Sequence, residues 1–147
     1  MSCKFLVLIF LNHKNFLSRE SFDLALSELL IKHKVDLIVL AGFLKKIPPS
    51  VINYFNKKIV NIHPSLLPKY GGRGMYGSII HNKVIENNEI ETGISIHYVS
   101  ENYDSGEIIF QKKIQLNRDD TAKTVEKKIH ILEYEFYPQV IQSLLNE

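Results

Sequence analysis

The sequence predicts an α/β fold with a mostly parallel sheet, and three observations lead to this class. Strand-like and helix-like segments alternate through the first half of the chain. The run Val35–Ala41 is apolar without alternation, which is typical of a parallel strand covered on both faces. With 147 residues, 45% of them hydrophobic and 23% charged, the chain has the size and balance of a single globular domain, 1–147.

The first half contains three predicted strands separated by two predicted helices. Ser18 can cap the first helix, and Pro48-Pro49 can open the second because proline is tolerated in a first turn. Gly42 stops the second strand and Pro64 the third. In chain order the elements are strand Phe5–Leu11, helix 19–33, strand Val35–Ala41, helix 49–56 and strand Lys58–His63.

The second half begins with an irregular segment, because four of the five prolines fall between Pro48 and Pro68 and four of the seven glycines between Gly71 and Gly77. A helix follows the glycines and stops at Asn87-Asn88. The last helix should start at a cap, Asp119 or Asp120, and bend at Pro138. Two strands are predicted between these helices: Thr92–Val99, whose side chains alternate between the two faces of the strand, and Glu107–Leu116. The apolar stripe of the last helix consists of Val125, Ile129, Leu132, Phe136 and Val140.

The strongest signal for chemistry lies at the end of the third strand. Side chains two residues apart on a strand share a face, so Asn61 and His63 point the same way. Ligands of open α/β sheets bind beyond this end of the strands. A histidine can carry a proton at neutral pH, and an asparagine amide can donate to a developing oxyanion. The pair indicates a catalytic site; two buried groups that anchor a loop are the structural alternative.

Asp104 is a second candidate, between two predicted strands. A carboxylate near an imidazole can stabilise its cation, although Asp104-Ser105-Gly106 is also ordinary turn chemistry. His97 is expected to be a half-exposed strand histidine, with a place in the site as the alternative. Lys69 and Arg73 beside the glycines could meet an anion or be solvated.

Several other classes of function are disfavoured. Cys3 is the only cysteine, which argues against a disulfide framework and suits a reducing cytoplasm. The histidines lack paired metal-ligand spacing, so no metal is expected. A net charge of +2 with scattered lysine doublets predicts no nucleic-acid partner, and the apolar runs are too short to predict a membrane span.

Four stretches of the sequence, in order, resemble the phosphoribosylglycinamide formyltransferase family. The second of them is highly specific and favours this family over related formyltransferases. The stretches are Leu40-Ala41-Gly42-Phe43-Leu44, Asn61-Ile62-His63-Pro64-Ser65-Leu66-Leu67-Pro68-Lys69-Tyr70, Gly93-Ile94-Ser95-Ile96-His97-Tyr98-Val99 and Tyr103-Asp104-Ser105-Gly106.

The resemblance implies a Rossmann-like formyltransferase fold with helices on both faces of its sheet. It implies transfer of a formyl group from 10-formyltetrahydrofolate to the amine of glycinamide ribonucleotide in purine biosynthesis. Asn61, His63 and Asp104 match the family's catalytic residues, and Glu133 matches a contact to the ribonucleotide. The family's folate contacts fall on Arg19, Leu44, Lys45, Ile47, Asn61, Ser100, Glu101, Asn102, Tyr103 and Asp104.

The chain departs from the family at its front. The family begins with a strand, a glycine-rich loop that holds the ribonucleotide phosphate, a helix and a second strand, whereas this chain starts near the third strand. An N-terminally incomplete domain is therefore expected, with an unpaired edge at Val35–Ala41 through which copies could associate. Three hypotheses stay open: an active formyltransferase, a truncated remnant that retains folate binding, and another 10-formyltetrahydrofolate-dependent formyltransferase.

Overall fold

The computed structural model describes residues 13–146, and the chain divides into two compact units, Met1–Val35 and Asp36–Glu147. The strand predicted at Phe5–Leu11 and the lone Cys3 lie outside the described residues. In the first unit, a short 3-10 helix, η1 (His13–Asn15), precedes α1 (Arg19–Lys32), so the first predicted helix is confirmed.

The predicted cap of α1 is also confirmed. The Ser18 hydroxyl accepts from the Ser21 N–H, and the Ser21 hydroxyl accepts from the Ser18 N–H, both at 3.2 Å. This reciprocal pair satisfies two N–H groups that the first turn leaves without helical partners. Within the same unit, Phe22 is buried and meets Phe16 edge to face, with ring centroids 5.5 Å apart.

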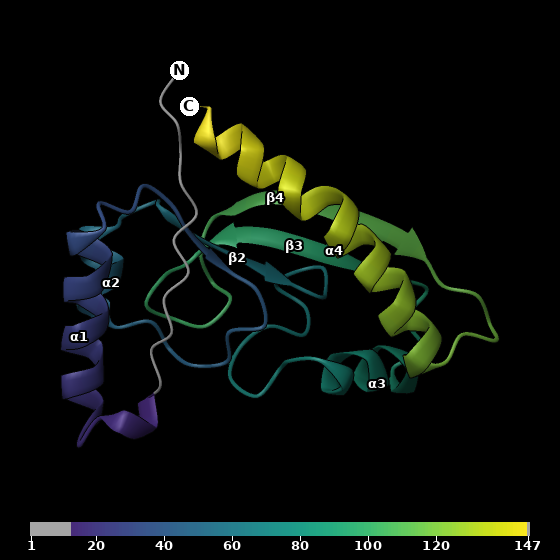
Figure 1. The fold of residues 1–147 in the computed structure, drawn as a ribbon. Coiled ribbons are helices and arrows are strands. Elements are labelled where there is room, and N and C mark those ends of the chain that lie inside the picture. Colours follow the sequence, from purple (N-terminus) through teal and green to yellow (C-terminus); the bar gives the residue numbers. More distant parts are fainter. Residues whose placement is uncertain (1–12, 147) are drawn as a thin grey trace. The chain divides into compact units, whose positions relative to one another are not determined.

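The second unit is built on a four-stranded sheet in the order β1-β2-β3-β4, of which Figure 1 labels β2, β3 and β4. Its helices and strands are β1 (Ile38–Leu40), α2 (Pro49–Tyr54), β2 (Ile59–His63), α3 (Ser78–Glu86), β3 (Glu91–Tyr98), β4 (Ile108–Gln115) and α4 (Ala122–Leu145). Each falls where the sequence predicts one, although β1 is much shorter than Val35–Ala41.

The direction of the strands corrects one expectation. Only β1 and β2 pair in parallel; β2–β3 and β3–β4 are antiparallel, so the described sheet is mixed and not mostly parallel. The connection between β3 and β4 covers only residues 99–107, and a loop this short can join antiparallel neighbours only.

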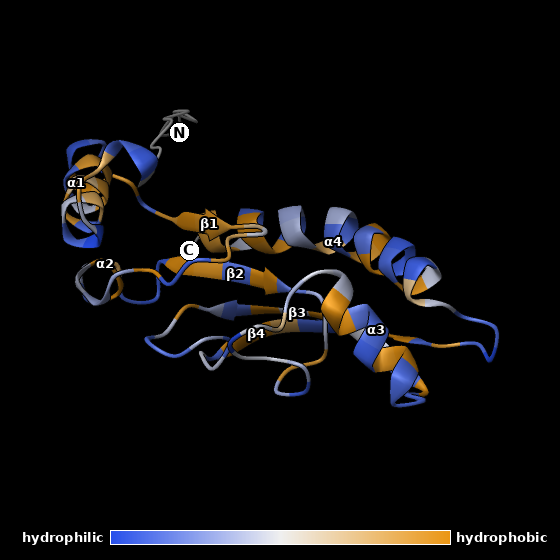
Figure 2. Ribbon diagram, turned by 90° about the horizontal axis from the view of Figure 1, so that it is seen from below, coloured by the Kyte–Doolittle hydropathy of each residue, from blue (hydrophilic) through white to orange (hydrophobic). Residues whose placement is uncertain are grey.

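The apolar core lies between the sheet and α4, which runs along one face of the sheet (Figure 2). Val60, Ile62, Ile94 and Ile96 on the strands meet the predicted stripe of the helix, of which Val125, Ile129 and Leu132 are buried. Half-buried Phe136 and Val140 extend this stripe. Each fully buried aliphatic side chain stabilises the fold by about 1.5–3 kcal/mol.

The start of α4 differs from the prediction. Its cap is Thr121, whose hydroxyl accepts from the Thr124 N–H at 3.3 Å; Asp119 and Asp120 precede the cap. Asp120 instead pairs with Lys128 at 2.6 Å and accepts from Asn117 and Thr124, which lowers its pKa to about 2. α4 continues as one helix through Pro138. Among residues 13–146, no helix has the length and apolarity needed to cross a membrane.

Candidate active site

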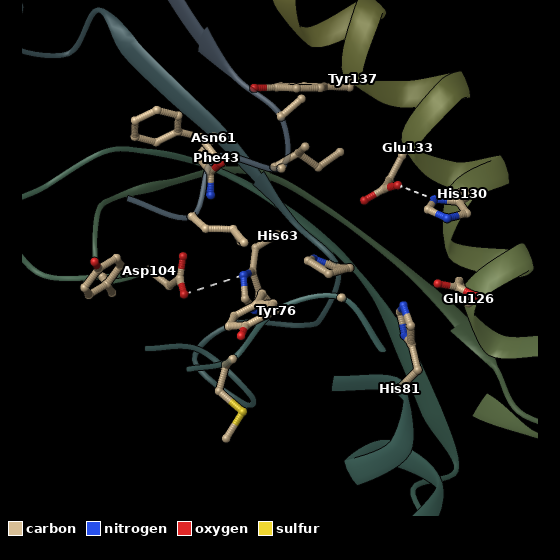
Figure 3. Close-up of a pocket in the computed structure, with 18 of the residues that line it drawn as sticks. Phe43, Asn61, His63, Tyr76, His81, Asp104, Glu126, His130, Glu133 and Tyr137 are labelled. Atoms are coloured by element: carbon tan, nitrogen blue, oxygen red, sulfur yellow. Dashed lines mark hydrogen bonds and ion pairs between the residues drawn. The ribbon is translucent and has the colours of Figure 1, made fainter. Parts of the chain in front are cut away.

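A cavity of about 1050 Å³ in the second unit opens beyond the carboxyl ends of β1 and β2. Its wall includes residues 41–44 after β1, 61–64 at the end of β2, the glycine segment 72–77, and one side of α4. Asn61, His63 and Asp104 all line it (Figure 3). The three candidate catalytic residues therefore meet at one cavity, at the sheet end where the sequence predicts a ligand.

His63 is only 4% exposed and is held through both ring nitrogens. Nε2 lies 2.8 Å from the carbonyl oxygen of Tyr70, and because a carbonyl can only accept, Nε2 carries a proton. Nδ1 faces the Asp104 carboxylate, 3.5 Å from Oδ2, so a second proton would sit between the two groups. Burial lowers the pKa of His63 below its ordinary value, and the Asp104 charge and the Tyr70 carbonyl oppose this only in part.

Asp104 is both a turn residue and a neighbour of the histidines. Its φ of 52° lies in the left-handed region, which aspartate tolerates better than most residues. The Gly72 N–H donates to Oδ2 at 2.9 Å, tying the glycine segment to the carboxylate. Burial by itself would raise the pKa of Asp104, but the neighbouring rings of His97 and His63 and the Gly72 N–H together lower it. Asp104 is therefore ionised at neutral pH.

His97 belongs to the same cluster, and the expectation of a half-exposed histidine is wrong because His97 is only 2% exposed. Its Nε2 lies 3.2 Å from Asn61 Nδ2 and 3.7 Å from Asp104 Oδ1. Both faces of β3 are covered, since Ser95 on the same face as His97 is fully buried and bonds the loop after β2. Spacing had placed His97 and Ser95 on one face, but only the register of β3 against β2 puts His97 opposite Asn61.

Most of the remaining expected folate residues gather at a second, smaller cavity of about 50 Å³. Leu44 instead lines the large cavity, and Glu101 lines neither of the two. Arg19 lies in the first unit, where it pairs with Asp23 at 2.7 Å. The expected residues at the small cavity are Lys45, Ile47, Asn61, Ser100, Asn102, Tyr103 and Asp104.

The α4 wall of the large cavity carries Glu133, whose carboxylate lies 2.8 Å from His130 Nδ1 (Figure 3). Two further residues of this cavity were not singled out as site residues by the sequence. His81 on α3 is 2% exposed, and burial lowers its pKa. The Tyr137 hydroxyl donates to the Leu40 carbonyl at 2.7 Å, which ties α4 to the end of β1. An isolated histidine and a helical tyrosine carry no distinguishing spacing.

The segment around the glycines is anchored at several points. Lys69 pairs with Glu89 at 3.0 Å, whereas Arg73 lines the large cavity, so of the two basic residues only Arg73 lies at the site. Gly72, Gly74 and Gly77 adopt positive φ values that other residues reach at a cost. Within the described part of the chain, no group of His, Cys, Asp and Glu side chains could hold a metal ion.

The arrangement suits acyl-type chemistry at a carbonyl. An amide donor, an imidazole and an ionised carboxylate converge on one cavity. Donors of this kind stabilise the negative charge that develops on a carbonyl oxygen when a nucleophile attacks. The carboxylate can receive the proton that an attacking amine must lose.

Comparison with known proteins agrees with this chemistry. The sequence model of the family described as formyl transferase matches residues 6–141. The chain is 40% identical over 132 residues to a phosphoribosylglycinamide formyltransferase of Bacillus subtilis, covering 90% of this chain and 65% of the relative. It is 38% identical over 122 residues to a chloroplastic phosphoribosylglycinamide formyltransferase of Arabidopsis thaliana, covering 83% and 42%. The chain thus spans less than two thirds of these curated relatives.

Solved structures give the same result. A phosphoribosylglycinamide formyltransferase from Bacillus halodurans matches with a TM-score of 0.80 and 34% identity, covering 91% of this chain and 66% of that one. One from Streptococcus pneumoniae matches with a TM-score of 0.81 and 34% identity, covering 90% and 71%. The Rossmann-like formyltransferase fold expected from the sequence is confirmed.

Proposed function

The chain belongs to the formyl transferase family, and from this premise we propose that it transfers a formyl group from 10-formyltetrahydrofolate to the amine of glycinamide ribonucleotide. The observation that carries the proposal is the convergence of Asn61, His63 and Asp104 on one cavity. Relatives that are 38–40% identical bear the name of this activity.

The roles of the three residues follow from their chemistry. The formyl-folate supplies an activated formyl carbon, which the substrate amine attacks as the electrons of the C=O bond move onto oxygen. Asn61 donates to that oxygen, and His63 donates as well once the Asp104 charge and the developing oxyanion offset the burial that lowers its pKa. Both donors lower the energy of the developing charge. Asp104 keeps a proton on His63 Nδ1 and receives the amine proton, directly or through water. The C=O bond then re-forms as the bond between the formyl carbon and the folate nitrogen breaks, and the same proton passes to that nitrogen.

The 3.5 Å separation of His63 Nδ1 and Asp104 is compatible with this cycle. Catalytic hydrogen bonds are often long before substrate binds and tighten in the reacting complex. A proton on Nδ1 is therefore available to a substrate oxygen as well as to Asp104.

The surroundings of the trio suit a folate on one side and a polar acceptor on the other. Ile47 and Phe43 offer apolar surface at the small cavity, beside the polar loop Ser100, Asn102 and Tyr103. Planar, partly polar ligands are held by such mixtures of apolar walls and a few oriented polar groups. We assign the formyl-folate to this side, across the small cavity and the adjoining part of the large one, with Leu44, Lys45 and Glu101 as further contacts.

Glu133 supports placing the ribonucleotide against α4. Its carboxylate lines the large cavity and can accept from sugar hydroxyls, with His130 holding it in place at 2.8 Å. Arg73, also on the cavity wall, offers a cation for the phosphate of the substrate.

We further propose that residues 1–147 act as one formyltransferase domain in the cytoplasm, since the family match crosses both units.

In the described sheet β1 pairs only with β2, and Val39 on β1 is 41% exposed. An open strand edge of this kind can pair with a second copy of the chain. Sedimentation at several concentrations tests this association.

Formyl transfer by the purified chain tests the function. Wild type, His63→Ala and the control His33→Ala, an exposed histidine on α1, are incubated with 10-formyltetrahydrofolate and glycinamide ribonucleotide. We expect turnover by wild type and control, and a loss on the order of 10²–10⁴-fold in His63→Ala. Wild-type turnover no higher than that of His63→Ala would refute the proposal.

Two other results separate the alternatives. Transfer to other amines but not to glycinamide ribonucleotide would identify a different formyl-folate enzyme. Binding of the folate without any transfer, measured by calorimetry, would identify a chain that retains only the folate site.

A further inference from the structure

We propose that His97 is a positioning residue that orients the Asn61 amide through a single tautomer of its ring. The effect of His97 on catalysis rests on the proposed formyl transfer, but the geometry of His97 and its neighbours does not. His97 is one of the least exposed polar residues of the second unit, at 2%, and it is contacted from three directions.

The tautomer of His97 is set by its own backbone neighbour. Nδ1 lies 2.9 Å from the carbonyl oxygen of Tyr98. A carbonyl oxygen can only accept, so Nδ1 carries the ring proton and Nε2 of the neutral ring is an acceptor. The pairing of β3 with β4 shifts by one residue at Ile96/His97, which leaves Ile109 of β4 as the extra residue beside this position.

The acceptor at Nε2 then determines which way the Asn61 amide faces. Asn61 Nδ2 lies 3.2 Å away and donates one of its two N–H groups. In the reversed orientation, the amide oxygen would face a ring nitrogen that has no proton to give. The tautomer therefore sets the amide, and the second N–H of Asn61 remains for a ligand oxygen.

The same nitrogen lies near Asp104 but does not bond to it, because a ring nitrogen without a proton and a carboxylate oxygen are both acceptors. The two carboxylate oxygens are divided between the histidines: Oδ2 lies 3.5 Å from His63 Nδ1 and accepts from Gly72, while Oδ1 lies 3.7 Å from His97 Nε2. Gly72 therefore holds Asp104 in front of His63, and the contribution of His97 to the trio runs through Asn61. A displacement of about 1 Å at such groups can cost on the order of 10²-fold in rate.

Two substitutions separate the functions of the two ring nitrogens. In His97→Gln the side-chain amide can place an acceptor near the position of Nε2. In His97→Asn the amide is shorter and can replace only the bond from Nδ1 to Tyr98. We expect His97→Asn to lose kcat on the order of 10²-fold with KM for the formyl-folate nearly unchanged, and His97→Gln to recover most of that loss.

Nitrogen-15 NMR tests the geometry without reference to activity. We expect wild-type His97 to show the Nδ1–H tautomer, and the Asn61 side-chain amide to shift in His97→Asn but not in His97→Gln. The Nε2–H tautomer in wild type, or an Asn61 amide unchanged in His97→Asn, would overturn the proposal.

The kinetic and spectroscopic results also distinguish this proposal from the proposed function. Equal losses in the two variants, or a loss confined to KM, would mean that His97 is a packing residue only. If wild type transfers no formyl group, the proposed function fails, while the NMR measurements still decide the role of His97. Failure of His97→Asn to fold leaves the wild-type tautomer and the Gln variant as the deciding measurements.

Discussion

Replacing Gly106 with alanine tests how closely the Asp104 loop approaches β3. A Cβ at this position would overlap the carbonyl oxygen of Tyr98 and lie 2.8 Å from its carbonyl carbon. Carbon–carbon contacts are most favourable at about 3.5–4.0 Å, so the backbone would have to open by roughly 0.7 Å or more. Neither a Cβ nor a backbone carbonyl can escape by changing rotamer. The Tyr98 oxygen also accepts from His97, so the disturbance reaches the site.

Overpacking of this kind costs about 1–3 kcal/mol, and occasionally more. With a urea dependence of about 2 kcal/mol per molar, a loss of about 2 kcal/mol lowers the unfolding midpoint by about 1 M. Circular dichroism during urea unfolding measures this shift for Gly106→Ala.

The matched control is Gly74→Ala, where a new Cβ would meet nothing within 4 Å and only the positive φ of 85° opposes the substitution. That conformational cost is about 1–2 kcal/mol. A midpoint for Gly106→Ala equal to that of wild type would refute the close approach of the loop to β3.

Three further predictions concern stability, each measured by urea unfolding. Burial lowers the pKa of His63, so the unfolded chain binds its proton at a higher pH than the folded chain. The free energy of unfolding should therefore fall as pH drops below about 6.5, and it should fall less steeply in His63→Gln. An identical pH slope in wild type and His63→Gln would contradict this. Ile96→Ala should cost about 2–5 kcal/mol because the side chain is fully buried beneath α4, and a change within experimental error would place Ile96 outside the core. Thr121→Ala should cost about 1 kcal/mol, whereas Asp119→Ala should change stability by less than about 0.5 kcal/mol; the reverse order would restore Asp119 as the cap.

Local patterns predicted most of the elements because they depend on neighbouring residues alone. The apolar spacing of α4 and the Ser18 cap of α1 are properties of one turn of helix, and both are confirmed. The cap of α4 was misplaced because three adjacent polar residues, Asp119, Asp120 and Thr121, can all serve as caps. Asp120 is drawn to Lys128, and Thr121 takes the position that remains.

The candidate catalytic residues were predicted in two ways, from the residues themselves and from the family resemblance. Asn61 and His63 follow from the pleat of one strand, whereas the residues alone left Asp104 open between an imidazole partner and a turn residue. The family resemblance matches Asp104 to a catalytic residue and adds Glu133 and the folate contacts, all as positions still to be tested. The short distance between Asp104 and His63 could not follow from spacing, since 40 residues lie between them in the sequence. The chain returns to His63 through loops of irregular conformation. The cis Leu67–Pro68 bond and the positive φ of Tyr70 belong to those loops.

By itself, the sequence determined the α/β class, the order of helices and strands, the pair Asn61–His63 and the family, because each depends on local periodicity or on an uninterrupted motif. Only the tertiary structure decided the antiparallel direction of β3 and β4, the burial of His97 and its contacts with Asn61 and Asp104. Strand direction and burial depend on which surfaces meet across the sheet. One strand pattern allows a half-exposed histidine or a buried one, and the loop packed over β3 determines that His97 is buried.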